Sequence, residues 1–207
     1  MNEILKNRII ENHIILPIDI KTADNNKPIK VTDDYIDIGY SSSQTPARIL
    51  SNLYPYKFDY YGNEVSSIEA AIQSLKYEDV IIRKVCYTYS GIDAVHLRGM
   101  APYDWQKDGM LYTPIRPIDR FSEVYQIFLD ELYFFAFQNP LYKNNLLNSS
   151  PKALDHTIGE NDKHFSTLTR SEYISRLYAL RYCLENNLSS RNDVTKILIK
   201  VRQELTK

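Results

Sequence analysis

The sequence predicts a mainly α fold with a small β element, that is, an α+β chain. Three observations predict it. Apolar residues recur with helical spacing in several segments, one short segment alternates apolar and polar residues, and a Tyr-Gly-Asn turn joins two strand-like segments. At 207 residues, with 43% hydrophobic and 25% charged side chains, the chain is long enough to bury a core without disulfides.

We divide the chain into three parts: an N-terminal extension over residues 1–34, a central domain over 35–187, and a C-terminal helix over 188–207 packed on the domain. The extension begins helically in "NEILKNRIIENH", and Pro17 breaks any helix that follows. The C-terminal "DVTKILIKVRQEL" is amphipathic, and such a face more often packs on its own domain than on a partner.

The domain is expected to open with a strand and a hairpin. "DYIDIGYSSS" alternates in the manner of a short strand that runs into a turn, and "SSSQTP" is typical of a loop. "YKFDYYGNEV" predicts a hairpin with Gly62-Asn63 at its turn. Ser66 or Ser67 then caps the helix "IEAAIQSLKY", and a second helix, "EDVIIRKVCYTYS", ends near Gly91.

The second half is expected to be loop-rich at first and then helical. "GIDAVHLRGMAPYDWQKDGMLYTPIRPI" contains three prolines and predicts loops. A long apolar helix, "DRFSEVYQIFLDELYFFAFQN", stops at Asn139-Pro140, and the short helix "PLYKNNLLNSS" follows. "PKALDHTIGENDKHFSTLT" predicts a polar loop of about nineteen residues, a length that is often functional. Two helices, "RSEYISRLYALRYCLENN" and "SRNDVTKILIKVRQELTK", finish the chain.

Charge and cysteine content exclude several classes of protein. The net charge of −1 provides no bulk field for nucleic acid or anionic membrane, although a small basic site stays compatible with it. Cys86 and Cys183 are too few for a disulfide framework or a four-cysteine zinc site, and we expect both to be buried. No apolar run reaches the ~18 residues of a membrane span, and the N-terminus lacks a signal-peptide pattern. We therefore expect a soluble, cytoplasmic protein.

Glu69, Gln73 and Lys76 recur at positions i, i+4 and i+7 of the segment "IEAAIQSLKY". Seven residues make close to two helical turns, so the three side chains can share one face. One interpretation is a solvated face of an amphipathic helix. The other is a reactive site, in which partial burial of Glu69 would favour general acid–base chemistry.

Five segments follow one another in an order that resembles the NADAR family (NAD- and ADP-ribose-associated), which includes YbiA-like N-glycosidases. The resemblance covers about residues 35–182, and its segments are "IDIGYSSS", "LSNLYPYKFDYYGNEVSSIEAAIQSLKY", "HLRGMAPYDW", "FQNPLYKNNLLNSSPKALDHTIGENDKHF" and "YALR". It implies a compact multihelical domain with a small β element. The chain departs from the family pattern at Ala70, where the family has His, and at Phe165 and Ser166, where it has Trp and Gly.

The resemblance implies a hydrolase that cleaves an N-glycosidic bond to ribose, removing ADP-ribose from a modified guanine base or nucleic acid. The alternatives are a YbiA-like activity on a ribosylated pyrimidine of riboflavin synthesis, or a non-catalytic ADP-ribose or nucleotide sensor. An interaction protein that uses the N-terminal extension or the extra segment "YTPIRPIDRFSEVYQ" is a further class. The expected partner is an ADP-ribosylated or ribosylated base, with no membrane and no cofactor; the sequence sets no oligomeric state.

The residue roles come from the same resemblance. The catalytic candidates are Glu69, Lys76 and Asp162, and the substrate-binding candidates are Tyr40, Asn52, Gln73, Arg98, Trp105, Asp155 and Phe165. Cleavage passes through an oxocarbenium-like ribose, which a carboxylate stabilises, and an indole can stack on the base. Spacing shows only that Lys76 can share the face of Glu69; its role as a nucleophile is implied by the family. His156 and His164 flank Asp162, but this spacing is no recognised metal-ligand pattern, so no metal is expected.

Overall fold

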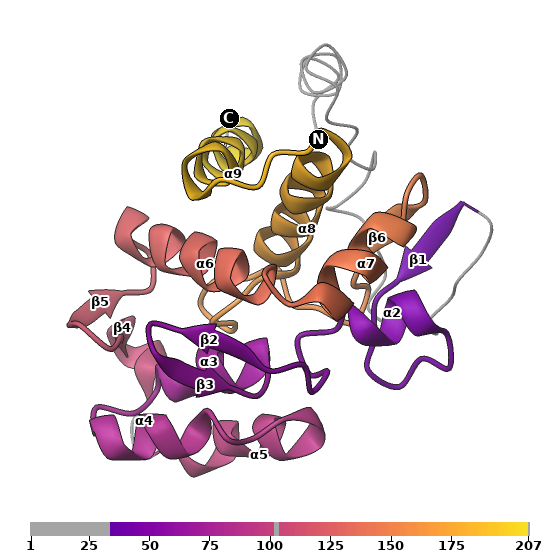
Figure 1. Cartoon of the computed structure of the whole chain (residues 1–207). Coiled ribbons are helices and arrows are strands. Elements are labelled where there is room, and N and C mark those ends of the chain that lie inside the picture. Colours follow the sequence, from indigo (N-terminus) through magenta and orange to yellow (C-terminus); the bar gives the residue numbers. More distant parts are fainter. Residues whose placement is uncertain (1–33, 102–103, 207) are drawn as a thin grey trace.

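The computed structural model describes residues 34–101 and 104–206 of the chain (Figure 1). Helices dominate and the strands are short and paired, so the predicted mainly α, α+β fold class is confirmed. The N-terminal extension expected over residues 1–34 falls almost entirely outside the described residues. None of the described helices is both long and apolar enough to cross a membrane.

The elements follow one another in a single order along the chain. They are β1 (Tyr35–Asp37), α2 (Thr45–Ile49), β2 (Phe58–Tyr60), β3 (Asn63–Val65), α3 (Ile68–Ser74), α4 (Val80–Cys86), α5 (Gly91–Met100), η1 (Trp105–Lys107), β4 (Met110–Tyr112), β5 (Pro117–Asp119), α6 (Glu123–Ala136), α7 (Pro140–Asn148), β6 (Ala153–Asp155), α8 (Arg170–Glu185) and α9 (Arg191–Thr206).

The predicted hairpin forms from β2 and β3, but its turn is one residue earlier than expected. Tyr60 pairs with Asn63, so the turn residues are Tyr61 and Gly62, with φ angles of 50° and 75°. Two left-handed residues give the turn the twist that antiparallel strands need. Asp59 Oδ1 accepts the Gly62 N–H at 3.0 Å, which stabilises this register.

Helix α3 begins where the sequence predicts and ends earlier. Ser67 Oγ accepts the Ala70 N–H at 3.1 Å and caps the helix. After Ser74, the N–H groups of Leu75, Lys76 and Tyr77 each bond to the carbonyl three residues before, so the chain tightens and leaves the helix. Lys76 therefore lies just beyond α3 rather than on its second turn.

Two regions that the sequence assigns to loops contain regular structure. The middle region begins with α5, continues through η1 and ends in the β4–β5 hairpin. The long polar region contains β6, which pairs in parallel with β1, so that Tyr35 lies opposite Ala153. These three-residue strands depend on partners elsewhere in the chain. The "SSSQTP" segment likewise contains the start of α2.

Helix α8 is the centre of the domain. Twelve of its sixteen residues are buried, so it is covered on nearly all sides. Figure 1 shows α6, α7 and α9 around it, and α9 packs on both α8 and α6. Several charged side chains that this burial encloses form ion pairs, as Arg176 does with Asp130 at 2.8 Å.

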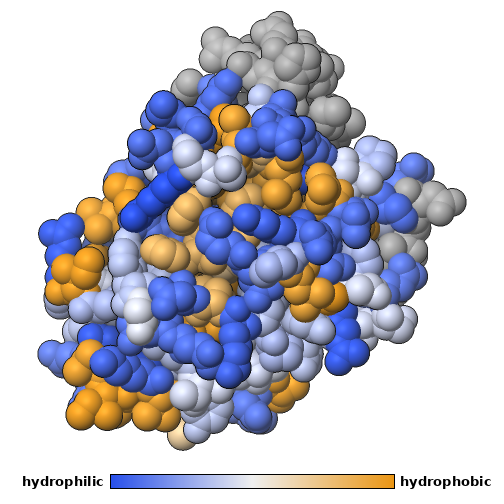
Figure 2. Space-filling view, viewed as in Figure 1, coloured by the Kyte–Doolittle hydropathy of each residue, from blue (hydrophilic) through white to orange (hydrophobic). Residues whose placement is uncertain are grey.

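Helix α4 lies at the edge of the molecule and exposes its apolar side. Apolar side chains gather over it at the lower left of Figure 2, and the exposed residues are Val80, Ile81, Ile82 and Val85. Asp79 Oδ1 caps the helix by accepting two backbone N–H groups. Cys86 packs with Tyr77 and Leu97, and Arg83 donates to the Tyr77 and Glu78 carbonyls, so these contacts attach α4 to the domain.

Candidate functional site

A cavity of about 730 Å³ lies between α3, η1, the loop after β6 and the start of α8. Pockets for small molecules typically have volumes of ~300–1,000 Å³, so the cavity has the size of a ligand site. Six of the residues expected from the sequence line it: Asn52, Glu69, Gln73, Lys76, Trp105 and Phe165. Glu69, Gln73 and Lys76 of the segment "IEAAIQSLKY" therefore do face one cavity.

Helix α3 presents an acid and an amide that are bonded to each other. Gln73 Nε2 donates to Glu69 Oε1 at 2.7 Å. Gln73 is only 5% exposed, and its Oε1 atom has no hydrogen-bond partner among the described residues. A buried acceptor without a partner costs free energy, and a ligand that donates a hydrogen bond removes this cost. Half-buried Glu69 and buried Gln73 thus offer acceptor oxygens to the cavity.

Asn52 connects this helix to the core. Its carbonyl accepts the Glu69 N–H at 2.9 Å, and its Oδ1 atom accepts the Tyr133 hydroxyl at 2.8 Å. The start of α3 is therefore anchored at two points. Lys76 is 4% exposed and lines the same cavity, although it lies beyond the end of the helix.

Two aromatic side chains complete the cavity. Trp105 is buried in η1, where Asp104 Oδ1 accepts the Gln106 N–H at 3.2 Å and Gly109 N–H donates to the Trp105 carbonyl at 2.8 Å. Phe165 comes from the loop after β6 and is 70% exposed. One ring is therefore fixed, and the other lies at the open side of the cavity.

Three of the expected substrate-binding or catalytic residues, Tyr40, Asp155 and Asp162, do not line this cavity. Tyr40 packs against Gly91, with its hydroxyl 2.9 Å from the position that a Cβ atom there would take. Asp155 is buried at the end of β6, where Arg170 Nε donates to its Oδ1 at 2.6 Å, so its carboxylate serves the core. Asp162 is exposed and accepts the His164 N–H at 2.8 Å within its own loop.

Arg98 belongs to α5, and its side chain is not among those that the structure describes. The cavity also has lining residues that the sequence did not suggest. Prominent among them are His156, Arg170 and Tyr173, which come from the end of the β1–β6 pair and the first turn of α8. A histidine in a long polar loop was a visible signal, but we considered it only as a metal ligand. Within residues 34–101 and 104–206, no group of three or more His, Cys, Asp and Glu is arranged to hold a metal ion.

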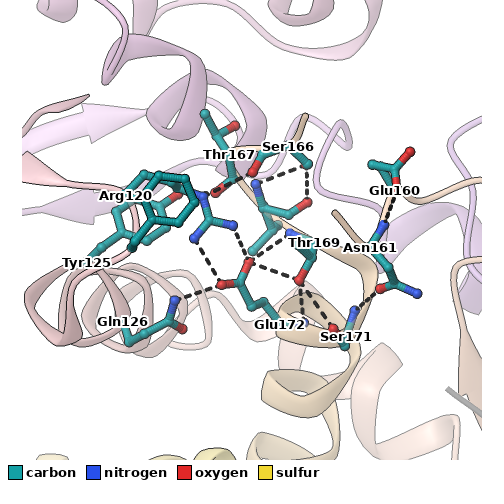
Figure 3. A network of polar contacts seen from close by, with 12 residues as sticks. Arg120, Tyr125, Gln126, Glu160, Asn161, Ser166, Thr167, Thr169, Ser171 and Glu172 are labelled. Atoms are coloured by element: carbon teal, nitrogen blue, oxygen red, sulfur yellow. Dashed lines mark hydrogen bonds and ion pairs between the residues drawn. The ribbon is translucent and has the colours of Figure 1, made fainter. Parts of the chain in front are cut away.

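A buried network holds the wall of the cavity that runs from Ser166 to Thr169 (Figure 3). Arg120 forms a fork with the Glu172 carboxylate at 3.0 and 2.7 Å, and its Nε donates to the Ser166 carbonyl at 3.0 Å. Glu172 also accepts the Thr169 N–H at 2.8 Å, which closes a capping box at the start of α8. The "TRSE" spacing of that box was readable in the sequence. The sequence gives no sign that Arg120 and Glu172 form a fork.

The charges of this network determine its protonation. Burial by itself would raise the pKa of Glu172, but the guanidinium of Arg120, together with Arg176 and the Thr169 N–H, holds the pKa below its usual value. Glu172 is therefore ionised at neutral pH and binds Arg120 firmly. The Tyr125 hydroxyl adds a hydrogen bond to the Thr167 carbonyl, so the cavity wall is fixed from behind.

The fold and the cavity define a mainly helical protein with a polar, ligand-sized site at the end of its central helix. The family model of bacteriophage protein GP30.3 matches residues 44–182, about two thirds of the chain. The chain therefore belongs to the bacteriophage GP30.3 protein family. The NADAR resemblance is wrong, because the family whose model matches this region is GP30.3. No curated protein and no solved structure matches the chain.

Proposed function

We propose that this protein is a hydrolase that cleaves the N-glycosidic bond between a ribose and a base. One observation supports it above the others: Glu69, Gln73 and Lys76 line a single cavity together with the indole of Trp105. A carboxylate, an amide and an amine beside a flat ring are the groups that charge stabilisation and base stacking require.

The lining suits the two halves of a nucleoside. A ribose presents hydroxyl donors, and the cavity offers the Glu69 carboxylate and the unpartnered Gln73 Oε1 as acceptors. A base presents a π-face, and Trp105 and Phe165 provide aromatic surfaces for stacking, an interaction worth ~1–3 kcal/mol per base.

The chemistry assigns different tasks to Glu69 and Lys76. Breaking the C1–N bond leaves positive charge on the ribose, and the Glu69 carboxyl stabilises that charge or protonates the leaving base. Lys76 offers a second route, in which its amine bonds to C1 and displaces the base, which leaves with a proton from the amine. Ring opening of the resulting ribosylamine gives a Schiff base on Lys76. In both routes a water molecule attacks C1, directly in the first and at the Schiff base in the second.

The substrates that we propose to test are ribosylated bases, because the cavity offers acceptor oxygens to a ribose and aromatic rings to a base. They are ADP-ribosylated guanine, free or in nucleic acid, and a ribosylated pyrimidine of the kind formed in riboflavin synthesis. A net charge of −1 favours recognition of the modified nucleotide itself over broad binding to a nucleic-acid backbone. A cytoplasmic location, where such nucleotides occur, is part of the proposal.

The test is direct analysis of products. The purified protein is incubated separately with ADP-ribosylated guanine, an ADP-ribosylated oligonucleotide, a ribosylated pyrimidine and NAD, and the released base is measured by liquid chromatography and mass spectrometry. We expect release from at least one ribosylated substrate, in an amount that rises with enzyme concentration. Absence of any released base from the whole panel would contradict the proposal.

A second candidate function is non-catalytic binding of ADP-ribose or a nucleotide. The exposed ring of Phe165 and the buried ring of Trp105 line the same cavity, which favours this function, because two aromatic surfaces can hold a base without any reaction. Calorimetry separates the two functions: tight binding of ADP-ribose by a protein that releases no base supports the sensor.

A further inference from the structure

His156 directly follows β6, and the β1–β6 pair fixes its backbone. The His156 N–H donates to Asp155 Oδ1 at 2.7 Å. The next residue, Thr157, donates to Asp37 of β1 through its backbone N–H at 2.9 Å and its hydroxyl at 2.5 Å. Both strands therefore set the position from which the imidazole enters the cavity.

The ring of His156 is held in one tautomer. Its Nδ1 atom lies 2.7 Å from the Ile38 carbonyl oxygen, which can only accept, so Nδ1 carries the hydrogen. The Tyr173 ring meets the imidazole nearly at right angles, with centroids 5.4 Å apart. Nε2 makes no hydrogen bond with any residue that the structure describes, and the side chain lines the cavity. The neutral ring therefore keeps a lone pair on Nε2.

Burial favours the neutral form of this ring. Burial lowers the pKa of His156 below its usual value, and Arg170 of α8 acts in the same direction. The Ile38 carbonyl, Asp37 of β1 and Asp155 of β6 act in the opposite direction without reversing the shift. Both carboxylates are already bonded, Asp37 to Thr157 and Asp155 to Arg170.

We propose that His156 is the general base of this site, an inference that rests on the proposed hydrolase function. Its Nε2 takes a proton from the water that attacks C1 of the ribose. The O–C1 bond forms as the C1–N bond breaks, the bonding pair leaves with the base nitrogen, and that nitrogen takes a proton from Glu69. The imidazolium then returns its proton through solvent, which reprotonates Glu69 and closes the cycle.

Tyr173 lies beside His156 in the cavity that Glu69 also lines. Its ring contacts His156, and the charge of Glu69 contributes to the raised pKa of its hydroxyl, behind the larger effects of burial and of the neighbouring Tyr142 and Tyr133. All three residues, Glu69, Tyr173 and His156, line the same cavity. In the route through Lys76, water attacks the imine carbon instead of the ribosyl C1–N bond, and His156 Nε2 again takes a proton from this water.

The decisive variant is His156→Asn. An asparagine amide can keep the donor near Nδ1, and thus the bond to the Ile38 carbonyl, while it removes the atom at Nε2. We expect kcat to fall by about 10²- to 10⁴-fold with KM changed only a few-fold, and added imidazole to restore part of the rate. The wild type should lose activity as pH falls through the lowered pKa of His156, and the variant should lack this acidic limb.

His164→Asn is the matched control, because His164 lies in the same loop, packs on Phe121 and does not line the cavity. Its kcat and pH profile should equal those of the wild type. If His156→Asn fails to fold by circular dichroism, the pH profile of the wild type decides. A rate that stays constant from pH 7 down to the lowest pH at which the protein remains folded overturns the inference. Undiminished release of base by folded His156→Asn also overturns it while leaving the hydrolase function intact. Absence of release by the wild type overturns both.

Discussion

Gln73 Nε2 donates a 2.7 Å hydrogen bond to Glu69 Oε1 one turn before it on α3, inside the cavity. This contact orients the carboxylate. It also occupies the amide N–H, while the Gln73 Oε1 atom stays buried without a partner among the described residues. The helix therefore presents an ordered acid next to an acceptor that a ligand hydroxyl in the cavity can satisfy.

Replacing Gln73 with Met tests this acceptor. The change removes a buried oxygen without a partner and also the Gln73 Nε2 bond to Glu69. These two effects have opposite signs, so we expect the free energy of unfolding to change little. A ligand hydroxyl that bonded to Oε1 is then left unpaired, which costs about 1–3 kcal/mol, or roughly 5- to 150-fold in Kd. Isothermal titration with ADP-ribose measures the affinity, and urea unfolding measures the stability. Unchanged affinity would show that the ligand does not use this oxygen.

Trp105 is expected to stabilise both the fold and the bound base. Trp105→Ala should cost about 3–5 kcal/mol of stability, because the indole is buried, and should weaken binding at the same time. Trp105→Phe keeps a ring in place, so it should retain most of the stability and lose less affinity than the alanine variant. Thermal melts with and without ligand separate the two effects. Equal affinity in all three proteins would argue against stacking on this ring.

The Arg120–Glu172 fork predicts how stability depends on pH. The pKa of Glu172 is lower in the folded protein than in the unfolded chain, so the ionised form stabilises the fold. This stability is fully present above the unfolded pKa, near the ordinary value of 4.5, and is lost as pH falls through the folded value. Glu172→Gln should remove this dependence and cost about 3–5 kcal/mol, because it leaves the Arg120 charge buried without its partner.

Glu64→Gln is the control for that variant. Glu64 pairs with Lys57 at 2.6 Å on the exposed hairpin, where an ion pair contributes little to stability. Chemical unfolding from pH 3 to pH 7 measures the free energy of unfolding of the wild type, Glu172→Gln and Glu64→Gln. If Glu172→Gln and Glu64→Gln unfold alike at every pH, the fork does not support the cavity wall.

The Schiff-base route makes a covalent prediction for Lys76. Borohydride added during turnover should reduce the imine and leave a stable ribosyl adduct on Lys76, detectable as a mass increase on its tryptic peptide. Lys76→Met should give no adduct. If base release continues at the wild-type rate in the Met variant, water attacks C1 directly and the amine has no covalent role.

Local signals predicted the local parts of the site. The Tyr-Gly-Asn sequence and the Ser67 cap have physical effects within a few residues, so the hairpin and the start of α3 followed from them. The spacing of Glu69 and Gln73 likewise placed both on one helix face. The turn register and the end of α3 depend on pairing and on the tightened final turn, which the sequence does not display.

Contacts between residues far apart in the chain explain most of the differences between the sequence-based predictions and the structure. The sequence around Asp155 predicts a loop, because nothing near it reveals that β6 pairs with the distant β1. The Tyr35 hydroxyl of β1 donates to Asp155 although the two residues are 120 positions apart in the chain. The same pairing positions His156, whose fixed tautomer depends on the Ile38 carbonyl. The NADAR assignment failed for a related reason: short motifs in order describe local chemistry, and the match over residues 44–182 is to another family.

The most direct test of the central claim compares wild-type protein, Glu69→Gln and Glu64→Gln in a single-turnover assay of base release. Glu69→Gln keeps the size of the side chain and an oxygen that can accept from Gln73, and it removes only the charge and the acid. We predict that release slows by about 10²- to 10⁴-fold in Glu69→Gln and is unchanged in Glu64→Gln. Equal rates in all three proteins would contradict the account.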